Sequence, residues 1–239
     1  MQMKRYILPV LISLFTIGVA AQTKKTLRID YALTGNIRNQ EISVTEMSTF
    51  DGWAGRTVNM ERNLLRGNGD ITMRDARTGR IIYTQSFSTL FQEWIATEEA
   101  RHVRRAFQAS YNLPFPRERM EVEVTLFDFH RRPVASLCHT VDPSDILIRQ
   151  LGDNGLSHRY LWLGGAPTAD AVPDIEGCID LAIVAEGYTE GEMAKFHKDC
   201  RQVGDALFCH EPFRSLQDRF NVVAVESPSP DSGPSVPRL

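Results

Sequence analysis

The hydrophobic period of this chain changes near residue 178, and the change divides it into two parts that cannot share one kind of sheet. From Leu27 to about Leu151, apolar and polar residues mostly alternate and turn residues separate short runs, which is typical of half-buried antiparallel strands. Residues 179–185 are almost continuously apolar, as in a parallel strand covered on both faces. We therefore predict an α+β protein: an antiparallel β-sandwich followed by an incomplete α/β (β-α-β) unit.

The first part predicts six short strands and one helix. A single sheet would leave its apolar face in water, so the strands are expected to form a sandwich. Turn residues at 76–79 and 131–133 predict two hairpins. A helical segment over residues 88–102 is expected to cap one end of the sheet. The strands are expected at residues 26–33, 41–47, 70–75, 80–87, 120–130 and 134–141.

A Gly-, Pro- and Asp-rich passage over residues 152–176 predicts a linker between the two parts. The apolar run after it leads into a helix, because Thr189 and Glu192 have the spacing of a capping box. Residues 220–225 then predict a second buried strand, parallel to the first. Two strands and one helix leave unpaired edges and exposed apolar surface. The apolar stripe of the helix consists of Met193, Phe196, Cys200, Val203 and Leu207.

The first 21 residues have the layout of a signal peptide, as in exported bacterial proteins. Lys4 and Arg5 precede an apolar run that continues to Ala21. The alternative is a membrane anchor, but the run is shorter than the roughly 20 residues that cross a bilayer. Small residues at 19–21 predict cleavage after Ala21, which leaves Gln22 as the mature N-terminus. We expect a periplasmic or extracellular product with no membrane contact after cleavage.

Charge and cysteine content narrow the possible partners. Twenty-seven basic and thirty acidic residues give a net charge of -3, so no electrostatic footprint for nucleic acid or anionic lipid is present. An apolar content of 42% is sufficient for a real core. Four cysteines are too few for a disulfide framework in a chain of this length. Their pairing and the oligomeric state stay open; the cysteines are Cys138, Cys178, Cys200 and Cys209.

Several short stretches resemble one known family. Residues 180–189 resemble the opening of the catalytic domain in secreted immunoglobulin-A-peptidase-like zinc metallopeptidases, metallopeptidase family sixty-four. Residues 220–222 are similar to the second strand of that domain. The first part of the chain, after its signal peptide, resembles the β-rich domain that precedes the peptidase domain in many members. Further matching residues are Glu192, Lys195, Phe196, Asp199, Val225, Ser227, Ser232, Gly233 and Pro237.

The resemblance implies a zinc peptidase that acts on proteins or peptides, but the family's zinc motif, His-Glu-x-x-His, does not occur in these 239 residues. Catalytic zinc requires about three protein ligands and a nearby carboxylate. No catalytic, cofactor-binding or metal-binding residue is therefore assigned, and zinc is implied only for the full-length family enzyme. We expect residues 22–151 to be the family's β-sandwich domain and residues 177–239 the truncated start of its catalytic domain, inactive as given.

Two other groups of residues have site chemistry. His197, Cys200, Cys209 and His210 include metal-ligand types, and the first two can share a helix face; the competing interpretation is that Cys200 is simply buried. The turn at residues 186–189 lies where α/β folds often bind ligands or anions. The competing interpretation there is a tight turn with a capping threonine.

A non-catalytic function is the alternative to the peptidase hypothesis. Trp53 and Trp162 could be exposed stacking platforms through which a β-sandwich module binds a glycan or a host protein, or they could be packed loop anchors. A basic run could bind an anionic partner, but in a chain of net charge -3 a solvated face is the favoured interpretation. The run consists of Arg101, His102, Arg104 and Arg105.

Overall fold

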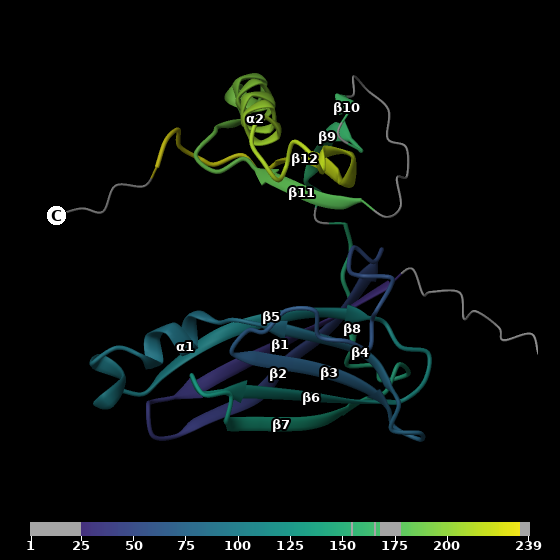
Figure 1. The fold of residues 1–239 in the computed structure, drawn as a ribbon, viewed down its shortest axis with the longest axis vertical. Coiled ribbons are helices and arrows are strands. Elements are labelled where there is room, and N and C mark those ends of the chain that lie inside the picture. Colours follow the sequence, from purple (N-terminus) through teal and green to yellow (C-terminus); the bar gives the residue numbers. More distant parts are fainter. Residues whose placement is uncertain (1–24, 154, 165, 168–177, 235–239) are drawn as a thin grey trace, which may run out of the picture. The chain divides into compact units, whose positions relative to one another are not determined.

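The computed structural model describes residues 25–153, 155–164, 166–167 and 178–234 (Figure 1). The predicted signal peptide lies outside these ranges. The chain divides into two compact units, residues 1–150 and residues 151–239. Within the described ranges, no helix combines the length and apolar character that a bilayer span requires.

Unit 1 contains two four-stranded sheets. All strand pairs are antiparallel except the short contact between β2 and β8. Sheet A has the order β5 (Arg105–Pro114), β1 (Lys25–Gly35), β2 (Gln40–Asp51) and β8 (Arg149–Gln150). Sheet B has the order β4 (Ile81–Phe87), β3 (Gly69–Asp75), β6 (Met120–Phe127) and β7 (Pro133–Val141).

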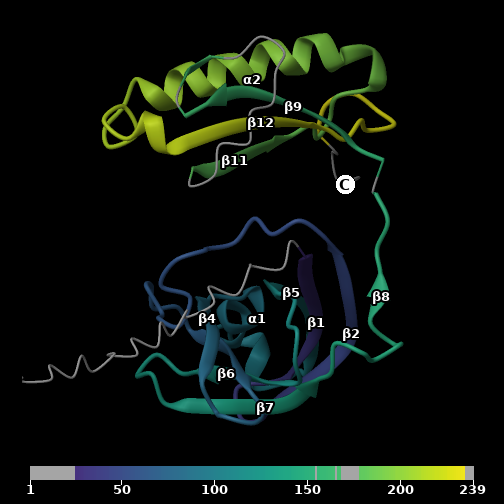
Figure 2. The same cartoon turned by 90° about the vertical axis from the view of Figure 1, so that its right-hand side faces the viewer.

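Figure 2 shows the strands of the two sheets of unit 1, and the buried side chains of both sheets form one core. Alternate residues of β1 and β6 are buried, because successive side chains of a strand point to opposite faces. Tyr31 of sheet A and His139 of sheet B meet inside the sandwich, with Oη and Nε2 2.8 Å apart. The predicted antiparallel β-sandwich is therefore confirmed. The fully buried side chains of β1 and β6 are Leu27, Ile29, Tyr31, Leu33, Val122, Val124 and Leu126.

The helical segment of unit 1 is shorter than predicted. Helix α1 spans Leu90–Ile95, and a 3-10 turn follows at Glu99–Arg101. The Thr89 side chain caps α1 by accepting a hydrogen bond from the Gln92 N–H. Phe91 and Trp94 of α1 pack against Phe107 of β5, with ring centroids 5.7 and 5.6 Å apart. The helix therefore covers the sandwich beside an edge strand.

Strand β5 is the main element of unit 1 that the sequence interpretation did not predict. Its inward side chains alternate, and Tyr111 and Leu113 are buried. Its outward positions hold Gln108, Ser110 and Asn112, which are not residues that favour strands. Pairing with β1 over ten residues, rather than local propensity, therefore fixes this strand.

Unit 2 has a four-stranded sheet in the order β10 (Ala166–Pro167), β9 (Ser157–Leu163), β12 (Phe220–Glu226) and β11 (Ile179–Val184). β11 and β12 are parallel, as predicted for the β-α-β unit. β9 pairs antiparallel with β12. Residues 157–163 therefore belong to this sheet, and the linker interpretation of residues 152–176 is wrong for them. Residues 168–176 of the predicted linker lie outside the described residues.

β11 differs from the expected strand that is covered on both faces. It lies at the edge of the sheet, and its side chains alternate between exposed and half-buried. Ile179 and Val184 are 59% and 54% exposed. Only the face that carries Leu181 and Ile183 packs into the core of unit 2. Among the described residues, this strand therefore has the unpaired edge and the exposed apolar surface that the sequence predicted.

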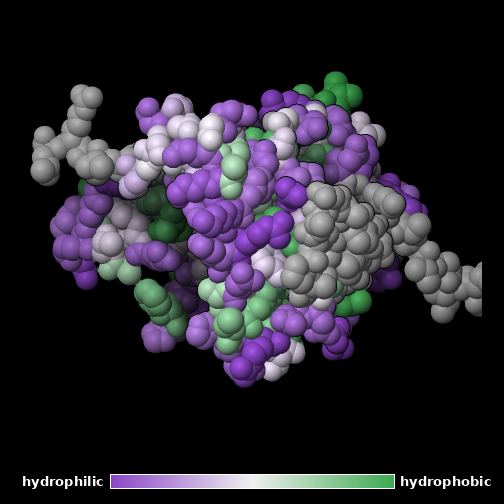
Figure 3. All heavy atoms as spheres, turned by 90° about the horizontal axis from the view of Figure 1, so that it is seen from above, coloured by the Kyte–Doolittle hydropathy of each residue, from purple (hydrophilic) through white to green (hydrophobic). Residues whose placement is uncertain are grey.

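Helix α2 (Met193–Phe208) covers one face of the sheet, but its buried stripe is not quite the predicted one. Phe196, Cys200, Gly204 and Phe208 are buried, whereas Val203 is 52% exposed. At Gly204 the helix backbone lies close to the Trp162 ring, because a Cβ there would be 2.6 Å from that ring. On the face shown in Figure 3, hydrophilic residues predominate and apolar residues form small separate patches.

Candidate functional site

The carboxyl ends of β11 and β12 bring two connecting segments together in unit 2. The Gly187 N–H donates to Ser229 Oγ at 2.9 Å, and the Ser229 N–H donates to the Tyr188 carbonyl at 2.8 Å. The Gly233 N–H donates to the Gly187 carbonyl at 2.7 Å. Gly187 has a φ of 74°, and a Cβ there would lie 2.9 Å from the Gly233 oxygen. The segment after β12 is thus fastened over the turn after β11, and we call this arrangement the carboxyl-end latch (residues 186–192 with 227–234).

A carboxylate of the chain itself occupies the N-terminus of the helix. Glu192 Oε2 accepts hydrogen bonds from the Thr189 N–H at 2.9 Å and from Thr189 Oγ1 at 2.8 Å. Glu192 Oε1 accepts a third from Ser232 Oγ at 2.9 Å. These bonds, above all that from the Thr189 backbone, lower the pKa of Glu192. The structure therefore favours the capped turn over the anion site at residues 186–189, because the Thr189 N–H is already occupied.

Three side chains surround the first turns of α2. Tyr188 Oη donates to Asp199 Oδ2 at 2.9 Å, and Lys195 Nζ lies 2.6 Å from the same oxygen. The Lys195 ammonium also lies 4.8 Å from the centroid of the Tyr188 ring. The Lys195 hydrogen bond is the main cause of the lowered pKa of Asp199. This group orients the helix on the turn and keeps Asp199 ionised.

Of the four candidate metal ligands that the sequence suggested, His197 alone contacts a carboxylate among the described residues. Its Nε2 lies 2.6 Å from Glu226 Oε1, at the carboxyl end of β12. Nδ1 of His197 is buried and has no hydrogen-bond partner among the described residues. Sequence reasoning did not single out Glu226, although its position at the end of a parallel strand was the available signal.

The other members of the His/Cys group do not converge on His197. Cys200 is 1% exposed, and burial raises the pKa of its thiol to about 11. Cys209 caps the far end of the helix and is exposed, as is His210. All four cysteines of the chain are free thiols in the structure. The buried-cysteine interpretation therefore accounts for Cys200 better than metal binding does.

The residues present do not fit the zinc ion that the resemblance implies. Across the parts of the chain that the structure describes, no group of three or more His, Cys, Asp or Glu side chains could hold a metal ion. A catalytic zinc needs about three such ligands. The described residues therefore do not supply the ligand set of a catalytic zinc site.

The basic run beside α1 is neutralised by ion pairs. Arg101 Nε lies 2.8 Å from Glu98, and Arg105 Nη2 lies 2.5 Å from Glu99. Arg104 Nη2 lies 3.2 Å from Glu41. Pairs as exposed as these contribute little to stability. The solvated-face interpretation fits this arrangement, since each arginine already has an acidic neighbour.

Neither tryptophan of the glycan hypothesis is an exposed platform. Trp53 is half-buried, its Nε1 donates to the Arg56 carbonyl at 3.0 Å, and its ring meets Tyr83 edge-on at 5.6 Å. Trp162 is 4% exposed and packs against Phe208. Both are packed anchors, so they provide no stacking surface for a sugar.

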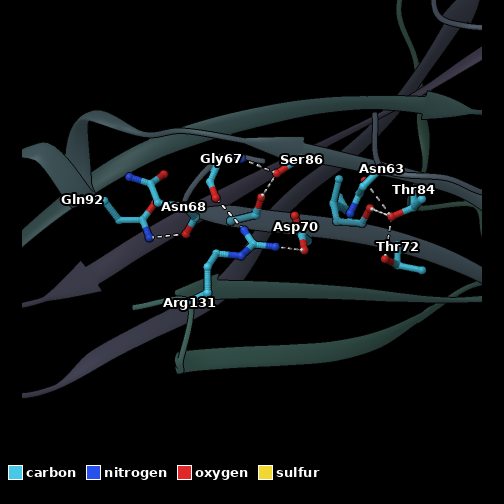
Figure 4. Close-up of polar contacts among 11 residues, drawn as sticks. Asn63, Gly67, Asn68, Asp70, Thr72, Thr84, Ser86, Gln92 and Arg131 are labelled. Carbon is cyan, nitrogen blue, oxygen red and sulfur yellow. Dashed lines mark hydrogen bonds and ion pairs between the residues drawn. The ribbon is translucent and has the colours of Figure 1, made fainter. Parts of the chain in front are cut away.

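A polar cluster that sequence reasoning missed lies on the outer face of sheet B (Figure 4). Arg131, at the hairpin between β6 and β7, has a φ of 61° and donates to the Gly67 carbonyl at 2.5 Å and to Asp70 Oδ2 at 3.0 Å. Its guanidinium also lies 4.2 Å from the centroid of the Phe127 ring. These contacts tie the hairpin to the start of β3, and their separation of about 60 residues in sequence explains why no local pattern revealed them.

Together these features define a class of protein: an antiparallel β-sandwich followed by a small α/β unit with a parallel β-α-β connection. Residues 20–137 match the family described as Peptidase M64 N-terminus, and residues 168–238 match the family described as IgA Peptidase M64. The chain belongs to the M64 family of IgA-peptidase-like proteins and is metallopeptidase-like. Membership in a peptidase family indicates protein as the general class of substrate. No curated protein matches the chain significantly.

Proposed function

We propose that these residues supply the accessory β-sandwich and the first β-α-β unit of an exported M64-type zinc peptidase, and that they do not hydrolyse peptides by themselves. The observation that carries the proposal is the correspondence between the two family matches and the two structural units. The match at 20–137 lies in unit 1, and the match at 168–238 lies in unit 2.

Inactivity is supported by the residue types in the chain. His-Glu-x-x-His is absent from the sequence, and the described residues hold no group of metal ligands. A water molecule activated by zinc needs that ligand set and a general base beside it. The carboxyl-end latch and the His197–Glu226 pair position chain segments rather than a nucleophile.

A zinc-loading and proteolysis assay tests this proposal. The purified chain is dialysed against zinc, its bound metal is measured by mass spectrometry, and casein and immunoglobulin A are offered as substrates, with thermolysin as the positive control. We expect neither stoichiometric zinc nor cleavage products. Zinc-dependent cleavage that a chelator abolishes would refute the proposal.

Export is a separate part of the proposal and has its own test. The layout of residues 1–21 supports a cleaved signal peptide. Expression in a bacterial host, followed by N-terminal sequencing of the periplasmic fraction, should give a chain that begins at Gln22. Retention of the whole protein in the cytoplasm would count against export.

The rival function, an exported β-sandwich module that binds a glycan, is less well supported. Its sequence argument depended on exposed Trp53 and Trp162, and both are packed. A binding measurement with tryptophan fluorescence would revive it only if a glycan perturbed one of these indoles.

A further inference from the structure

The edge of sheet A formed by β5 combines an open strand with a pocket beside it. In the order of sheet A, β5 has β1 as its only strand neighbour among the described residues. The exposed side chains of Gln108 and Ser110 lie in the middle of this strand. Neither residue is charged, and no Pro stands between Arg105 and Leu113. Natural edge strands usually carry charged residues or prolines, which prevent pairing with another chain.

The register of the ladder shows which backbone groups of β5 face outward. The Phe115 N–H donates to the Lys25 carbonyl at 3.0 Å, so this pair is hydrogen-bonded. The antiparallel register continues without a shift from Pro114 to Arg105. Hydrogen-bonded pairs alternate with non-bonded ones in such a ladder. The N–H and C=O groups of Gln108 and Ser110 therefore point away from β1, toward the free edge.

A pocket of about 230 Å³ opens beside these two residues. Its apolar lining includes Leu33, Phe107 and Tyr111 from sheet A and Phe91 from α1. Leu90 also lines the pocket and is 70% exposed. The volume is below the range for a whole drug-sized ligand, so it suits a single side chain.

Charge at this edge is balanced. Arg105 is paired with Glu99, and Arg28, whose Nη2 donates to Ser110 Oγ, is paired with Asp30 at 2.9 Å. The edge therefore offers no net charge to a partner, and an uncharged segment complements it.

We propose that the β5 edge binds an extended, uncharged peptide segment of another protein, which adds a strand to sheet A and places one apolar side chain in the pocket. The outward groups of Gln108 and Ser110 supply the main-chain hydrogen bonds, and the pocket selects the side chain, as in other strand-addition interfaces. Every second residue of the added strand lies on the same face as Phe107 and Tyr111. The interaction needs no peptidase activity.

Fluorescein-labelled heptapeptides of sequence Thr-Val-Thr-X-Thr-Val-Thr test the proposal, with Leu, Phe or Met at X and Asp at X as the control. The full chain should bind at least one apolar peptide and bind the Asp peptide about tenfold more weakly. Gln108→Pro removes one outward N–H, which an edge strand tolerates, and should weaken binding about tenfold. Gln108→Ala is the matched control and should bind as the unchanged chain does.

Hydrogen exchange on the unchanged chain provides a measurement that does not depend on the variants folding. Bound peptide should slow exchange at the amides of Gln108 and Ser110. The proposal is overturned if none of the apolar peptides binds at about 1 mM. It is equally overturned if a peptide binds but leaves both amides unprotected, or if Gln108→Pro keeps its fold and binds the peptide undiminished.

Discussion

His197 and Glu226 join helix α2 to the carboxyl end of β12, with Nε2 and Oε1 2.6 Å apart. Their side chains are 18% and 29% exposed. The other ring nitrogen, Nδ1, is buried without a hydrogen-bond partner among the described residues. A buried polar atom without a partner is costly, so the hydrogen bond between Nε2 and Glu226 is the contact that offsets part of the cost of burying this imidazole.

Replacement of Glu226 should therefore destabilise unit 2. Glu226→Ala leaves the imidazole without its acceptor and should lower the free energy of unfolding by about 1–3 kcal/mol. Glu226→Gln keeps an acceptor oxygen and should lose less. Denaturant unfolding, with hydrogen exchange in α2 as the readout, measures the loss of stability in both Glu226 variants. The exposed Glu190→Ala is the control. Equal losses in Ala and Gln variants would contradict the assigned hydrogen bond.

Gly204 should tolerate no side chain, because its Cβ would lie 2.6 Å from the Trp162 ring. Gly204→Ala overpacks this contact and should cost about 1–3 kcal/mol, although alanine favours helices. Gly191→Ala is the matched control, since a Cβ there meets nothing within 4 Å. Chemical denaturation monitored by hydrogen exchange at the amides of α2 reports the difference. A stabilised Gly204→Ala variant would show that α2 lies farther from β9.

The carboxyl-end latch should depend on Glu192. Glu192→Ala removes the three hydrogen bonds from Thr189 and Ser232, and loss of a helix cap costs about 1 kcal/mol. We expect faster cleavage of residues 227–234 by a non-specific protease, because that segment loses one of its fastenings. Glu190→Ala, on the same turn but without such contacts among the described residues, should be cleaved at the unchanged rate. Identical cleavage of both variants would mean that the hydrogen bonds of Gly187 and Tyr188 hold the segment without Glu192.

Unit 1 should lose stability in mild acid through His139. Burial lowers the pKa of this imidazole in the folded state, whereas the unfolded chain has an ordinary value of about 6.5. The unfolded state therefore binds more protons as the pH falls through this value, and the free energy of unfolding decreases until the folded pKa is passed. Thermal melts of unit 1 between about pH 7 and pH 5 should show this slope, and His139→Gln should flatten it. An unaltered slope in the variant would assign the effect to another group.

The sequence by itself determined the elements whose signal is local. Alternation over residues 120–126 produced β6, and a continuous apolar run followed by the Thr189–Glu192 spacing produced the start of the β-α-β unit. Capping and side-chain period act between residues a few positions apart, so they are visible without the fold. The family resemblance was also visible in the sequence without the fold, because its motifs are short.

Tertiary structure alone decided the features that depend on distant partners. β5 has polar outward residues and becomes a strand because β1 pairs with it, and β9 joins the second sheet because β12 does. The buried stripe of α2 includes Gly204 rather than Val203, and the Trp162 ring lies close to the helix backbone there. Contacts across tens of residues have no period in the sequence, and burial against a particular neighbour overrides local propensity. The latch, the His197–Glu226 pair and the open β5 edge therefore appeared only when the chain was folded.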